Sequence, residues 1–476
     1  MTAPLWTARD AMTATGGRLD GPAWTASGIS IDSRTVAPGD LFVAIAGPNH
    51  DGHDHVGAAL AGGAAAAMVH RRPPGLDADA PLLTVTDTVR GLEGLAVAAR
   101  ARTRARIAAV TGSVGKTGTK EMLRLVLAEH GATHATQGNL NNHWGAPLSL
   151  ARMPTGSAYA VFELGMNHPG EIAPLSRLVR PHVAVITAIE AVHIEFFAST
   201  ADIADAKAEI FLGVEPGGIA ILPADSPHFE RLAGAARAAG IETILGFGTG
   251  TDADARLIAC EIEPDRTHAR AEISGRSIDF HVGMAGRHWA NNALAVLLAA
   301  QALGIEPGRA APALAAMRPP AGRGSRHVLA WGAGEITVID ESYNASPASM
   351  RAALATLAAF RPSKGGRRVA VLGDMLELGA QGPDAHAALA TTAIEAGIDL
   401  VFTAGPLMAG LREALPAGRS GGHGADADAL APLVVAGVEP GDVVMVKGSA
   451  GSRMSRVVAA LRQKSGSAKD VGDNAL

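Results

Sequence analysis

The 476-residue sequence contains a single cysteine, Cys260, and no apolar run long enough to cross a membrane. One cysteine excludes an internal disulfide framework and any zinc or iron–sulfur site built from several cysteines. The longest uncharged stretch of Ala, Gly and apolar residues, 57–69, is well short of the roughly 20 residues that a membrane-spanning helix needs. Residues 1–20 lack a basic segment followed by an apolar core. We therefore expect no signal peptide, no stable membrane insertion and a cytoplasmic location.

Positive charge is not in excess, and lysine is especially rare. The formal net charge is −5 at pH 7, so nothing indicates nucleic acid as a partner. Of the 41 lysine and arginine residues, only seven are lysine. The chain therefore makes its ordinary positive charge with arginine. Each lysine becomes a candidate for chemistry that an amine can perform and a guanidinium cannot.

Strand-like and helix-like segments alternate along most of the chain, which predicts βαβ units, mainly parallel sheets and an α/β fold. At about 100–200 residues per domain, the length suits two to four domains. We divide the chain into residues 1–104, 105–321 and 322–476, with the second boundary at the Pro/Gly-rich segment Arg318–Gly322. We expect strands at 28–32, 40–46, 82–86, 107–110, 159–163, 182–189, 335–340, 367–373, 400–404 and 442–447, helices at 119–130, 292–303, 349–360 and 384–396, and a glycine-rich loop at 418–424.

The segment Thr111–Thr117 reads Thr-Gly-Ser-Val-Gly-Lys-Thr and lies between an apolar strand and a helical pattern. In that setting glycines let backbone N–H groups converge on phosphate oxygens, and the start of the helix adds a favourable dipole. Lys116 would neutralise phosphate charge, and the Thr117 hydroxyl would ligate Mg²⁺. The longer phosphate-loop pattern has an earlier glycine that this chain lacks. A structural glycine turn therefore stays open as an alternative, although the whole context favours a nucleoside triphosphate site.

Two later strands carry polar groups at their carboxyl ends, where parallel α/β sheets form their sites. Glu163 ends one of these strands, and His193 follows the other. A carboxylate beside a phosphate loop commonly holds Mg²⁺, and a histidine can ligate a second metal ion. From local sequence alone, Glu163 could equally be a capping or surface carboxylate, and His193 an exposed or otherwise satisfied histidine.

Lys207 lies fourteen residues after His193, in a helix-like segment. Judged locally, it is a surface-helix lysine. A desolvated amine can also react with CO₂ to form a carbamate, which turns a cation into a metal-binding carboxylate. Arginine cannot do this, so the scarcity of lysine in the chain supports the second interpretation.

These segments and several others, in order along nearly the whole chain, resemble the Mur ligases. The matching segments are Asp32–Arg34, Gly39–Phe42, Asp51–His53, Gly112–Thr117, Gly138–Leu148, Glu163–Gly170, the spacing from His193 to Lys207, Asp340–Pro347, Gly373–Gly379 and Val446–Ser449. Each is modest alone, but so many collinear motifs are specific. The resemblance implies a smaller N-terminal α/β domain for a uridine nucleotide, a central P-loop ATPase-type domain with a mainly parallel sheet, and a C-terminal Rossmann-like ligase domain.

The resemblance implies an ATP-dependent amide ligase of cytoplasmic peptidoglycan precursor synthesis. In that family the γ-phosphoryl group moves to a substrate carboxylate, and an amine attacks the resulting acyl phosphate. The implied partners are UDP-N-acetylmuramoyl-tripeptide and D-alanyl-D-alanine, and we expect a monomer whose domains close over ATP. Two Mg²⁺ ions would offset the negative charge. Thr117 and Glu163 would hold one ion, and His193 and carbamylated Lys207 the other.

The resemblance also assigns binding residues. The family's His-Asn-Val-x-Asn-Ala-Leu stretch, which lies near the adenine, reads His-Trp-Ala-Asn-Asn-Ala-Leu here; Asn292 matches, whereas Trp289 replaces the first Asn and receives no role. Gly118 stands where many members have a second Thr, which we expect to matter little. Arg326 is preferred to Arg323 only for its place ahead of a strand. The implied ATP-binding residues are Gly112, Ser113, Val114, Gly115, Lys116, Thr117, Gly118, Asn292, Arg326 and Glu341; the implied substrate-binding residues are Ser33, Arg34, Asp51, Gly52, His53, Asn139, Asn142 and Asn344; the implied catalytic residues are Lys116, Glu163, His193 and Lys207.

Two other functions stay open at this point. A sister ligase would add a single amino acid, but the segments Glu163–Gly170 and Glu341–Asn344 favour the dipeptide-adding reaction, and the sequence has no Asn-Pro-Arg segment of the amino-acid-reading kind. A GTPase or other regulatory nucleotide switch would need a base-specificity segment such as Asn-Lys-x-Asp, and the sequence has none.

Overall fold

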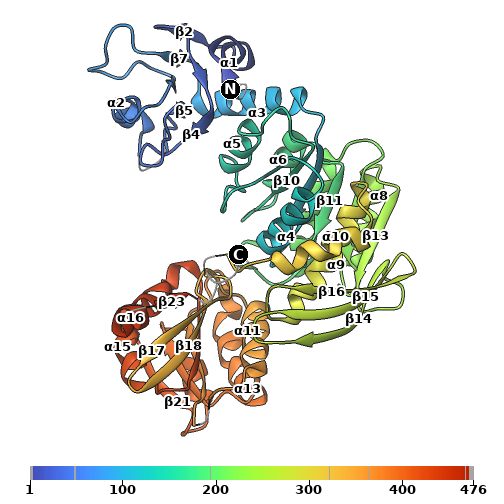
Figure 1. Ribbon diagram of the computed structural model, residues 1–476, viewed down its shortest axis with the longest axis vertical. Helices are drawn as coiled ribbons and strands as arrows, with labels where there is room; N and C mark the ends of the chain where they lie inside the picture. Colours follow the sequence, from blue (N-terminus) through green and yellow to red (C-terminus); the bar gives the residue numbers. More distant parts are fainter. Residues whose placement is uncertain are drawn as a thin grey trace.

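Three large β-sheets follow one another along the chain, and two short strands pair near its N-terminus (Figure 1). The computed structural model describes residues 4–47, 50–192, 194–320, 322–363, 365–466 and 468–470. Most strand pairs in the large sheets are parallel, and helices alternate with strands along the chain. The predicted α/β fold is confirmed. Within the described ranges, no helix combines the length and the apolar character needed to cross a bilayer.

The N-terminal part of the chain folds around a five-stranded sheet. Its elements are β1 (Trp6–Thr7), α1 (Ala8–Thr15), β2 (Arg18–Asp20), β3 (Thr25–Ala26), β4 (Gly28–Ser30), β5 (Asp40–Val43), η1 (Gly52–His55), α2 (Val56–Ala61), β6 (Ala66–Val69), β7 (Leu82–Thr84) and α3 (Thr88–Arg102). The sheet order is β2-β7-β6-β5-β4, and only β2 runs antiparallel to its neighbour. Strands β5 and β6 are buried throughout, as parallel strands covered on both faces are.

The central part contains the largest sheet, of nine strands. Its elements are β8 (Arg106–Thr111), α4 (Lys116–Ala128), β9 (Thr133–Ala135), α5 (Gly145–Ala151), β10 (Tyr159–Glu163), α6 (Ile172–Val179), β11 (Val183–Ile186), η2 (Ile194–Phe196), α7 (Thr200–Ala208), η3 (Glu209–Gly213), β12 (Ile219–Pro223), α8 (Phe229–Ala238), β13 (Thr243–Gly248), β14 (Ala255–Ile262), β15 (Thr267–Ile273), β16 (Arg276–Val282), α9 (Arg287–Ala302), α10 (Pro307–Ala310) and η4 (Ala311–Ala316).

The order of the central sheet explains where a site can form. It runs β16-β15-β14-β13-β12-β11-β8-β10-β9, parallel from β9 to β14 and antiparallel from there to β16. From β8 the chain first forms β9 and β10 on one side of β8 and then crosses to β11 on the other. Such a reversal opens a crevice at the carboxyl ends of the strands. The phosphate-loop segment follows β8, at that crevice.

The C-terminal part folds around a seven-stranded sheet of order β21-β20-β19-β22-β18-β17-β23, in which β17 runs antiparallel to both of its neighbours, β18 and β23. Its elements are β17 (Ser325–Trp331), β18 (Gly334–Glu341), α11 (Pro347–Ala359), β19 (Arg368–Gly373), η5 (Gly379–Gln381), α12 (Gly382–Ala387), α13 (Leu389–Glu395), β20 (Leu400–Ala404), α14 (Ala409–Ala414), β21 (Ser420–Gly424), α15 (Ala427–Gly437), β22 (Val443–Lys447), η6 (Ala450–Ser452), α16 (Ser455–Ser465) and β23 (Ala468–Asp470).

The three parts contact one another unequally (Figure 1). Helix α3 of the N-terminal part packs against α5 of the central part, and the Trp6 indole N–H donates to the Ala151 carbonyl at 3.0 Å. One apolar cluster contains buried residues of both the central and the C-terminal parts, including Ile203 and Leu354. A second apolar cluster contains buried residues of both the N-terminal and the central parts, including Leu92 and Leu148, so the core of the central part is continuous with both of the others.

Two predicted elements differ from the structure. The predicted helix at 384–396 is two helices, α12 and α13, and the His386 ring is fixed inside the first by bonds to the Gly382 carbonyl and the Met375 N–H. The predicted loop at 418–424 is wrong, because Ser420–Gly424 forms strand β21. A side chain at Gly421 would lie 2.7 Å from the Phe402 ring. That glycine therefore permits close packing of an edge strand rather than marking a loop.

Candidate active site

The loop from Gly112 to Gly115 joins β8 to α4 and is held tightly against the end of β11. Ser113 donates its N–H to the Ala188 carbonyl at 2.8 Å and its hydroxyl to the Glu190 carbonyl at 2.9 Å. Gly112 has φ +149°, and a Cβ there would lie 2.0 Å from the Thr187 Oγ1. Only glycine fits, so the loop's shape follows from the approach of the two strand ends.

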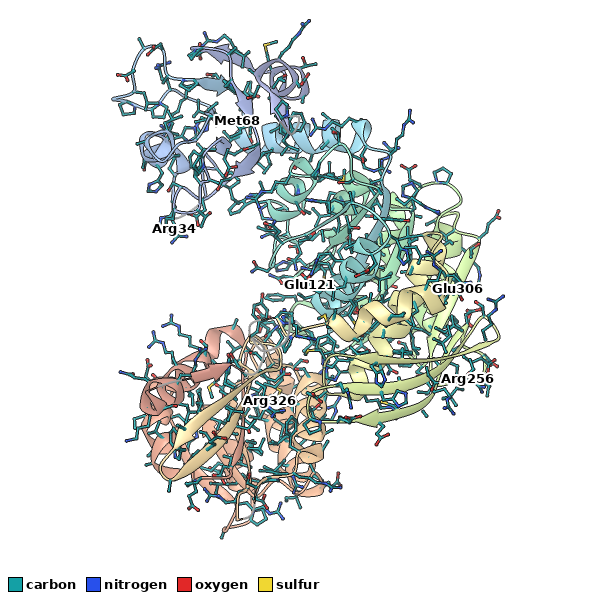
Figure 2. The ribbon with its side chains drawn as sticks, viewed as in Figure 1. Arg34, Met68, Glu121, Arg256, Glu306 and Arg326 are labelled. Atoms are coloured by element: carbon teal, nitrogen blue, oxygen red, sulfur yellow. The ribbon has the colours of Figure 1, made fainter. Side chains whose placement is uncertain are left out.

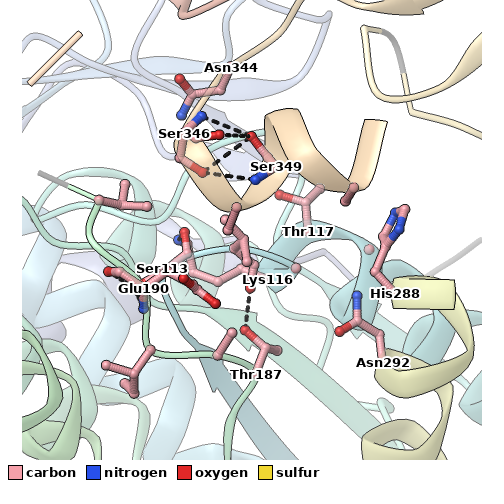
Figure 3. Close-up of a pocket in the computed structure, with 18 of the residues that line it drawn as sticks. Ser113, Lys116, Thr117, Thr187, Glu190, His288, Asn292, Asn344, Ser346 and Ser349 are labelled. Carbon is pink, nitrogen blue, oxygen red and sulfur yellow. Dashed lines mark hydrogen bonds between the residues drawn. The ribbon is translucent and has the colours of Figure 1, made fainter. Parts of the chain in front are cut away.

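A cavity of about 700 Å³ opens over this loop, between the central and C-terminal parts (Figure 3). Its floor includes Ser113–Gly118, its wall includes Asn292 of α9, and its opposite side includes Glu341 and Asn344. In Figure 3 the labelled side chains of Lys116, Thr117, His288 and Asn292 surround one space, which Ser346 and Ser349 of the C-terminal part face. The cavity is large enough for a nucleoside triphosphate and reaches the helix N-terminus that favours anions.

Lys116 starts helix α4, and its amine turns back onto the loop. Its Nζ donates to the Gly112 carbonyl at 2.6 Å. Burial lowers the pKa of Lys116, while the nearby Glu163 carboxylate raises it and Arg323 lowers it further. The amine thus lies in a poorly solvated setting between a carboxylate and a guanidinium, where phosphate would provide stronger acceptors than backbone carbonyls.

Glu163, at the end of β10, is 2% exposed. Its Oε1 accepts from the Asn141 amide at 2.7 Å, whereas its buried Oε2 has no hydrogen-bond partner among the described residues. A buried carboxylate oxygen without a donor is costly unless a cation meets it. This oxygen is therefore a suitable ligand for the expected Mg²⁺. The hydroxyl of Thr117, which lines the same cavity, is a suitable second ligand. No group of three or more His, Cys, Asp or Glu residues within the described ranges forms a ready cation cage.

Lys207 is not a surface lysine. It lies on α7 and is 3% exposed, and burial together with the charge of Lys116 holds its pKa well below the usual lysine value. Lys116 and Glu163 both line the cavity over the phosphate loop, whereas Lys207 does not. His193, the remaining predicted metal ligand, lies outside the described residues.

The C-terminal part contributes charged groups to the cavity. The Lys447 Nζ lies 3.2 Å from the Glu341 Oε2 and donates to the Asn344 carbonyl at 3.0 Å. Arg323 lines the cavity, and its guanidinium lies over the Tyr343 ring, 4.0 Å from its centroid. Arg326 does not line the cavity; it lies on β17 with its Nε buried and without a partner among the described residues. Of the two arginines weighed from the sequence, Arg323 is thus the one at the cavity.

The predicted substrate residues of the N-terminal part lie away from the cavity, and Figure 2 shows Arg34 across a gap from the C-terminal part. Arg34 is exposed and forms a two-pronged ion pair with Asp32, which lowers the pKa of Asp32 to about 2. His53 is buried, bonding to Asp51 through Nδ1 and accepting the His70 N–H at Nε2. His53 therefore orients Asp51, which also pairs with Arg71. Ser33 lies in the turn between Asp32 and Arg34, and Gly52 is the first residue of η1, between Asp51 and His53.

The asparagines of the 138–148 segment have different places. Asn139, one of the predicted substrate-binding residues, lines the cavity. Asn142 accepts the N–H groups of Trp144 and Gly145 and so caps the start of α5, outside the cavity. Sequence reasoning missed Asn141, which lines the cavity and holds Glu163. The several asparagines of that segment indicated a binding site, but the sequence alone could not show which of them would line the cavity.

Family models match three successive segments of the chain. The Mur ligase family catalytic domain matches residues 25–100, the Mur ligase middle domain 110–300, and the Mur ligase glutamate ligase domain 326–450. The phosphate loop, the cavity above it and this match together define an ATP-dependent ligase that forms an amide bond, and the chain belongs to the Mur ligase family.

Individual relatives and solved structures are similar to nearly the whole chain. The chain is 36% identical to the UDP-N-acetylmuramoyl-tripeptide–D-alanyl-D-alanine ligase of Escherichia coli, over 94% of this chain and 96% of the relative. It is 34% identical to the ligase of the same name from Bacillus subtilis, over 90% and 92%. Among solved structures, MurF from Acinetobacter baumannii superposes with a TM-score of 0.84 at 31% identity, over 97% and 99% of the chains. MurF ligase from Thermotoga maritima in complex with ADP gives a TM-score of 0.75 at 28% identity, over 92% and 97%.

Proposed function

We propose that this ligase joins D-alanyl-D-alanine to UDP-N-acetylmuramoyl-tripeptide in cytoplasmic peptidoglycan precursor synthesis. The observation that carries the proposal is that Lys116 and the unpartnered, buried Glu163 oxygen meet at one cavity over the phosphate loop. The identity of the two substrates is inferred from the relatives cited above, which are named for this reaction.

The residues of the cavity account for the first chemical step. The substrate carboxylate and the ATP phosphates repel each other, so their approach needs fixed positive charge. Lys116 would leave the Gly112 carbonyl and bind the β- and γ-phosphates, while the loop N–H groups hold the phosphate oxygens. The carboxylate oxygen then attacks the γ-phosphorus, the bond to the ADP oxygen breaks, and an acyl phosphate forms. Arg323, on the opposite side, is placed to offset charge on the transferred group.

The second step joins the dipeptide. The neutral amine of D-alanyl-D-alanine attacks the acyl carbon, the tetrahedral intermediate expels phosphate, and the amine loses its proton. Water must be kept out, because it would hydrolyse the acyl phosphate. The cavity lies between the central and C-terminal parts, so movement of the C-terminal part can close it.

Two Mg²⁺ ions would supply charge neutralisation when bound. Thr117 and Glu163 are the residues for one ion, and His193 and carbamylated Lys207 for the other. For Lys207 the covalent step is attack of the neutral amine on CO₂, which forms an N–C bond and releases one proton. The lowered pKa of Lys207 favours the neutral amine that this step requires.

The remaining assignments belong to the same proposal. Residues 1–104 would bind the uridine nucleotide, 105–321 ATP, and 322–476 would complete the ligase site. The protein would act as a monomer, without nucleic acid. Ser33, Arg34 and Asp51 would contact the UDP-linked substrate, and Asn292 and Glu341 the nucleoside of ATP.

Trapping the intermediate tests the proposal. With ATP, UDP-N-acetylmuramoyl-tripeptide and hydroxylamine but no dipeptide, the enzyme should form ADP and a hydroxamate of the tripeptide. The Lys116→Ala variant should form neither above background, while Lys464→Ala, which changes an exposed lysine of α16, should match the parent. Hydroxamate that forms without ATP would overturn the mechanism.

A further inference from the structure

Lys120 is one of only seven lysines in the chain, and the function above gives it no role. It lies on α4 one turn after Lys116, is 0% exposed and does not line the cavity. Its Nζ donates to the Thr136 carbonyl at 2.7 Å and lies 2.8 Å from the Glu121 Oε1. Lysine is almost never fully buried unless its charge is paired. Glu121 supplies that pairing, so the bond to Thr136 is the contact that needs an explanation.

Thr136 directly follows β9 and holds the end of β10. It is 1% exposed. Its N–H donates to the Val161 carbonyl at 3.0 Å, and its Oγ1 accepts the Glu163 N–H at 3.2 Å. These two bonds fix the backbone from which the Glu163 carboxylate reaches the cavity. A displaced Thr136 would therefore move that carboxylate.

The segment that starts at Thr136 returns to the same carboxylate at Asn141. The Asn141 amide donates to the Glu163 Oε1 at 2.7 Å, and the Asn141 carbonyl accepts the Gly165 N–H at 2.9 Å. A Cβ at Gly165 would lie 2.9 Å from the Asn141 side chain, so the two segments fit closely. Residues 136–141 thus contact Glu163 at both of their ends. Lys120 ties the first of them to the helix that follows the phosphate loop.

We propose that Lys120 is a positioning residue for Glu163. Its amine holds the Thr136 carbonyl in place, and the segment from Thr136 to Asn141 holds the carboxylate with one oxygen free for the cation. The proposal rests on the assignment of Glu163 to Mg²⁺ under the proposed function. Lys120 acts through Thr136, because its own side chain does not reach the cavity. Helix α4 would then carry both the phosphate-binding amine of Lys116 and the amine that orders the metal site.

The competing explanation is that Lys120 only balances the charge of Glu121. Glu121 has a second cation, because its Oε2 lies 2.8 Å from the Arg124 Nε. Its carboxylate therefore keeps a partner without Lys120. The two explanations differ in what happens to metal binding when the charges at 120 and 121 are removed together.

The main test measures metal binding apart from turnover. Mn²⁺, a spectroscopic substitute for Mg²⁺, is titrated into the full chain with ADP and followed by electron paramagnetic resonance. The Mn²⁺ binding that Glu163→Gln abolishes defines the site. Lys120→Met should weaken this binding about 10-fold or more, the loss typical when a group that orients a metal ligand is removed. Lys464→Ala, at an exposed lysine of α16, should match the parent.

ADP binding without metal separates positioning from general damage. In EDTA, calorimetry should find the ADP affinity of Lys120→Met within about threefold of the parent, because the loop N–H groups and Lys116 still take the phosphates. An equal loss of ADP and Mn²⁺ affinity would overturn the proposal, since Lys120 would then only pack the helix of the phosphate loop.

A double substitution tests the charge-balance explanation. Lys120→Met combined with Glu121→Gln should recover the thermal midpoint that Lys120→Met lowers, but not the Mn²⁺ affinity. Recovery of both would mean that Lys120 only neutralises Glu121, and the proposal would be overturned. If Lys120→Met alone fails to fold, the double variant still decides the point.

Thr136 provides a matched pair of variants. Thr136→Val keeps the shape of the side chain but removes the acceptor of the Glu163 N–H, so it should weaken Mn²⁺ binding as Lys120→Met does. Thr136→Ser keeps the hydroxyl and should stay close to the parent. Because the two residues act on one segment, Lys120→Met and Thr136→Val together should cost less than the sum of their separate effects.

Two further outcomes are decisive. Unchanged Mn²⁺ binding in both Lys120→Met and Thr136→Val overturns the positioning role while leaving the proposed function intact. If Glu163→Gln binds Mn²⁺ as the parent does, Glu163 is not the metal ligand, and the metal assignment of the proposed function fails together with the role of Lys120.

Discussion

At the scale of single residues, the site depends on buried charged groups that bound ligands would satisfy. Lys116 donates to loop carbonyls, Glu163 has one buried oxygen without a donor, and Lys207 has a strongly lowered pKa. Each arrangement is unfavourable for a folded chain alone. Together they indicate a site that sacrifices stability for phosphate and cation binding.

Lys207 gives the first prediction. Because its pKa is lowered, its amine is neutral over a range in which an ordinary lysine is protonated, and the neutral fraction falls with acidification. With ¹³C-bicarbonate we expect a carbamate carbon signal by NMR that fades as the pH is lowered. Lys207→Ala should lack this signal, lose most activity, and regain part of it with short carboxylic acids. Full activity without such acids would rule out the carbamate ligand.

Asn141 gives the second prediction. The Asn141 amide donates to the Glu163 Oε1 and so orients this carboxylate. Loss of a hydrogen-bond partner that orients a metal ligand typically weakens metal affinity about 10- to 100-fold. Asn141→Ala should therefore raise the Mg²⁺ concentration needed for half-maximal activity by about tenfold or more, with less effect at saturating Mg²⁺. Gln301→Ala, which removes an exposed amide bonded to Ser274, is the control. An unchanged Mg²⁺ requirement would mean that Glu163 is oriented in another way.

At the scale of elements, the phosphate loop is shaped by its contact with β11. A side chain at Gly112 would overlap the Thr187 hydroxyl, so Gly112→Ala must displace the loop. We expect loss of measurable ADP binding by titration. Gly217→Ala is a matched control, because Gly217 also has a positive φ, +75°, but no neighbour within 4 Å. That control should cost about 1 kcal/mol of stability and leave ADP binding intact. Normal ADP binding by Gly112→Ala would argue against the loop as the phosphate site.

The same elements show what the sequence can and cannot predict. The phosphate loop was predictable because strand, glycines, lysine and helix are contiguous. The alternation of strands and helices likewise predicted the sheets. The bond from Asn141 to Glu163, the place of Arg323 at the cavity, and the bond from Lys120 to Thr136 depend on helices and strands distant in sequence, so no local pattern contains them. Strand β21 was misassigned because glycines that permit packing look like glycines that make a loop.

At the scale of the whole molecule, the N-terminal residues proposed to bind the uridine nucleotide lie apart from the cavity over the phosphate loop (Figure 2). One substrate must span both, so we expect the domains to close when all ligands bind. Small-angle scattering should give a smaller radius of gyration with a non-hydrolysable ATP analogue, the UDP-linked tripeptide and the dipeptide. ATP analogue alone should have less effect. Identical profiles with and without the full set would contradict closure.

The central claim is that this chain uses ATP to join a dipeptide to a UDP-linked tripeptide. The most direct measurement is phosphate release with each substrate omitted in turn. We expect release only when ATP, UDP-N-acetylmuramoyl-tripeptide and D-alanyl-D-alanine are all present, with one amide product formed per phosphate. Release that proceeds equally well with a single amino acid in place of the dipeptide would contradict it.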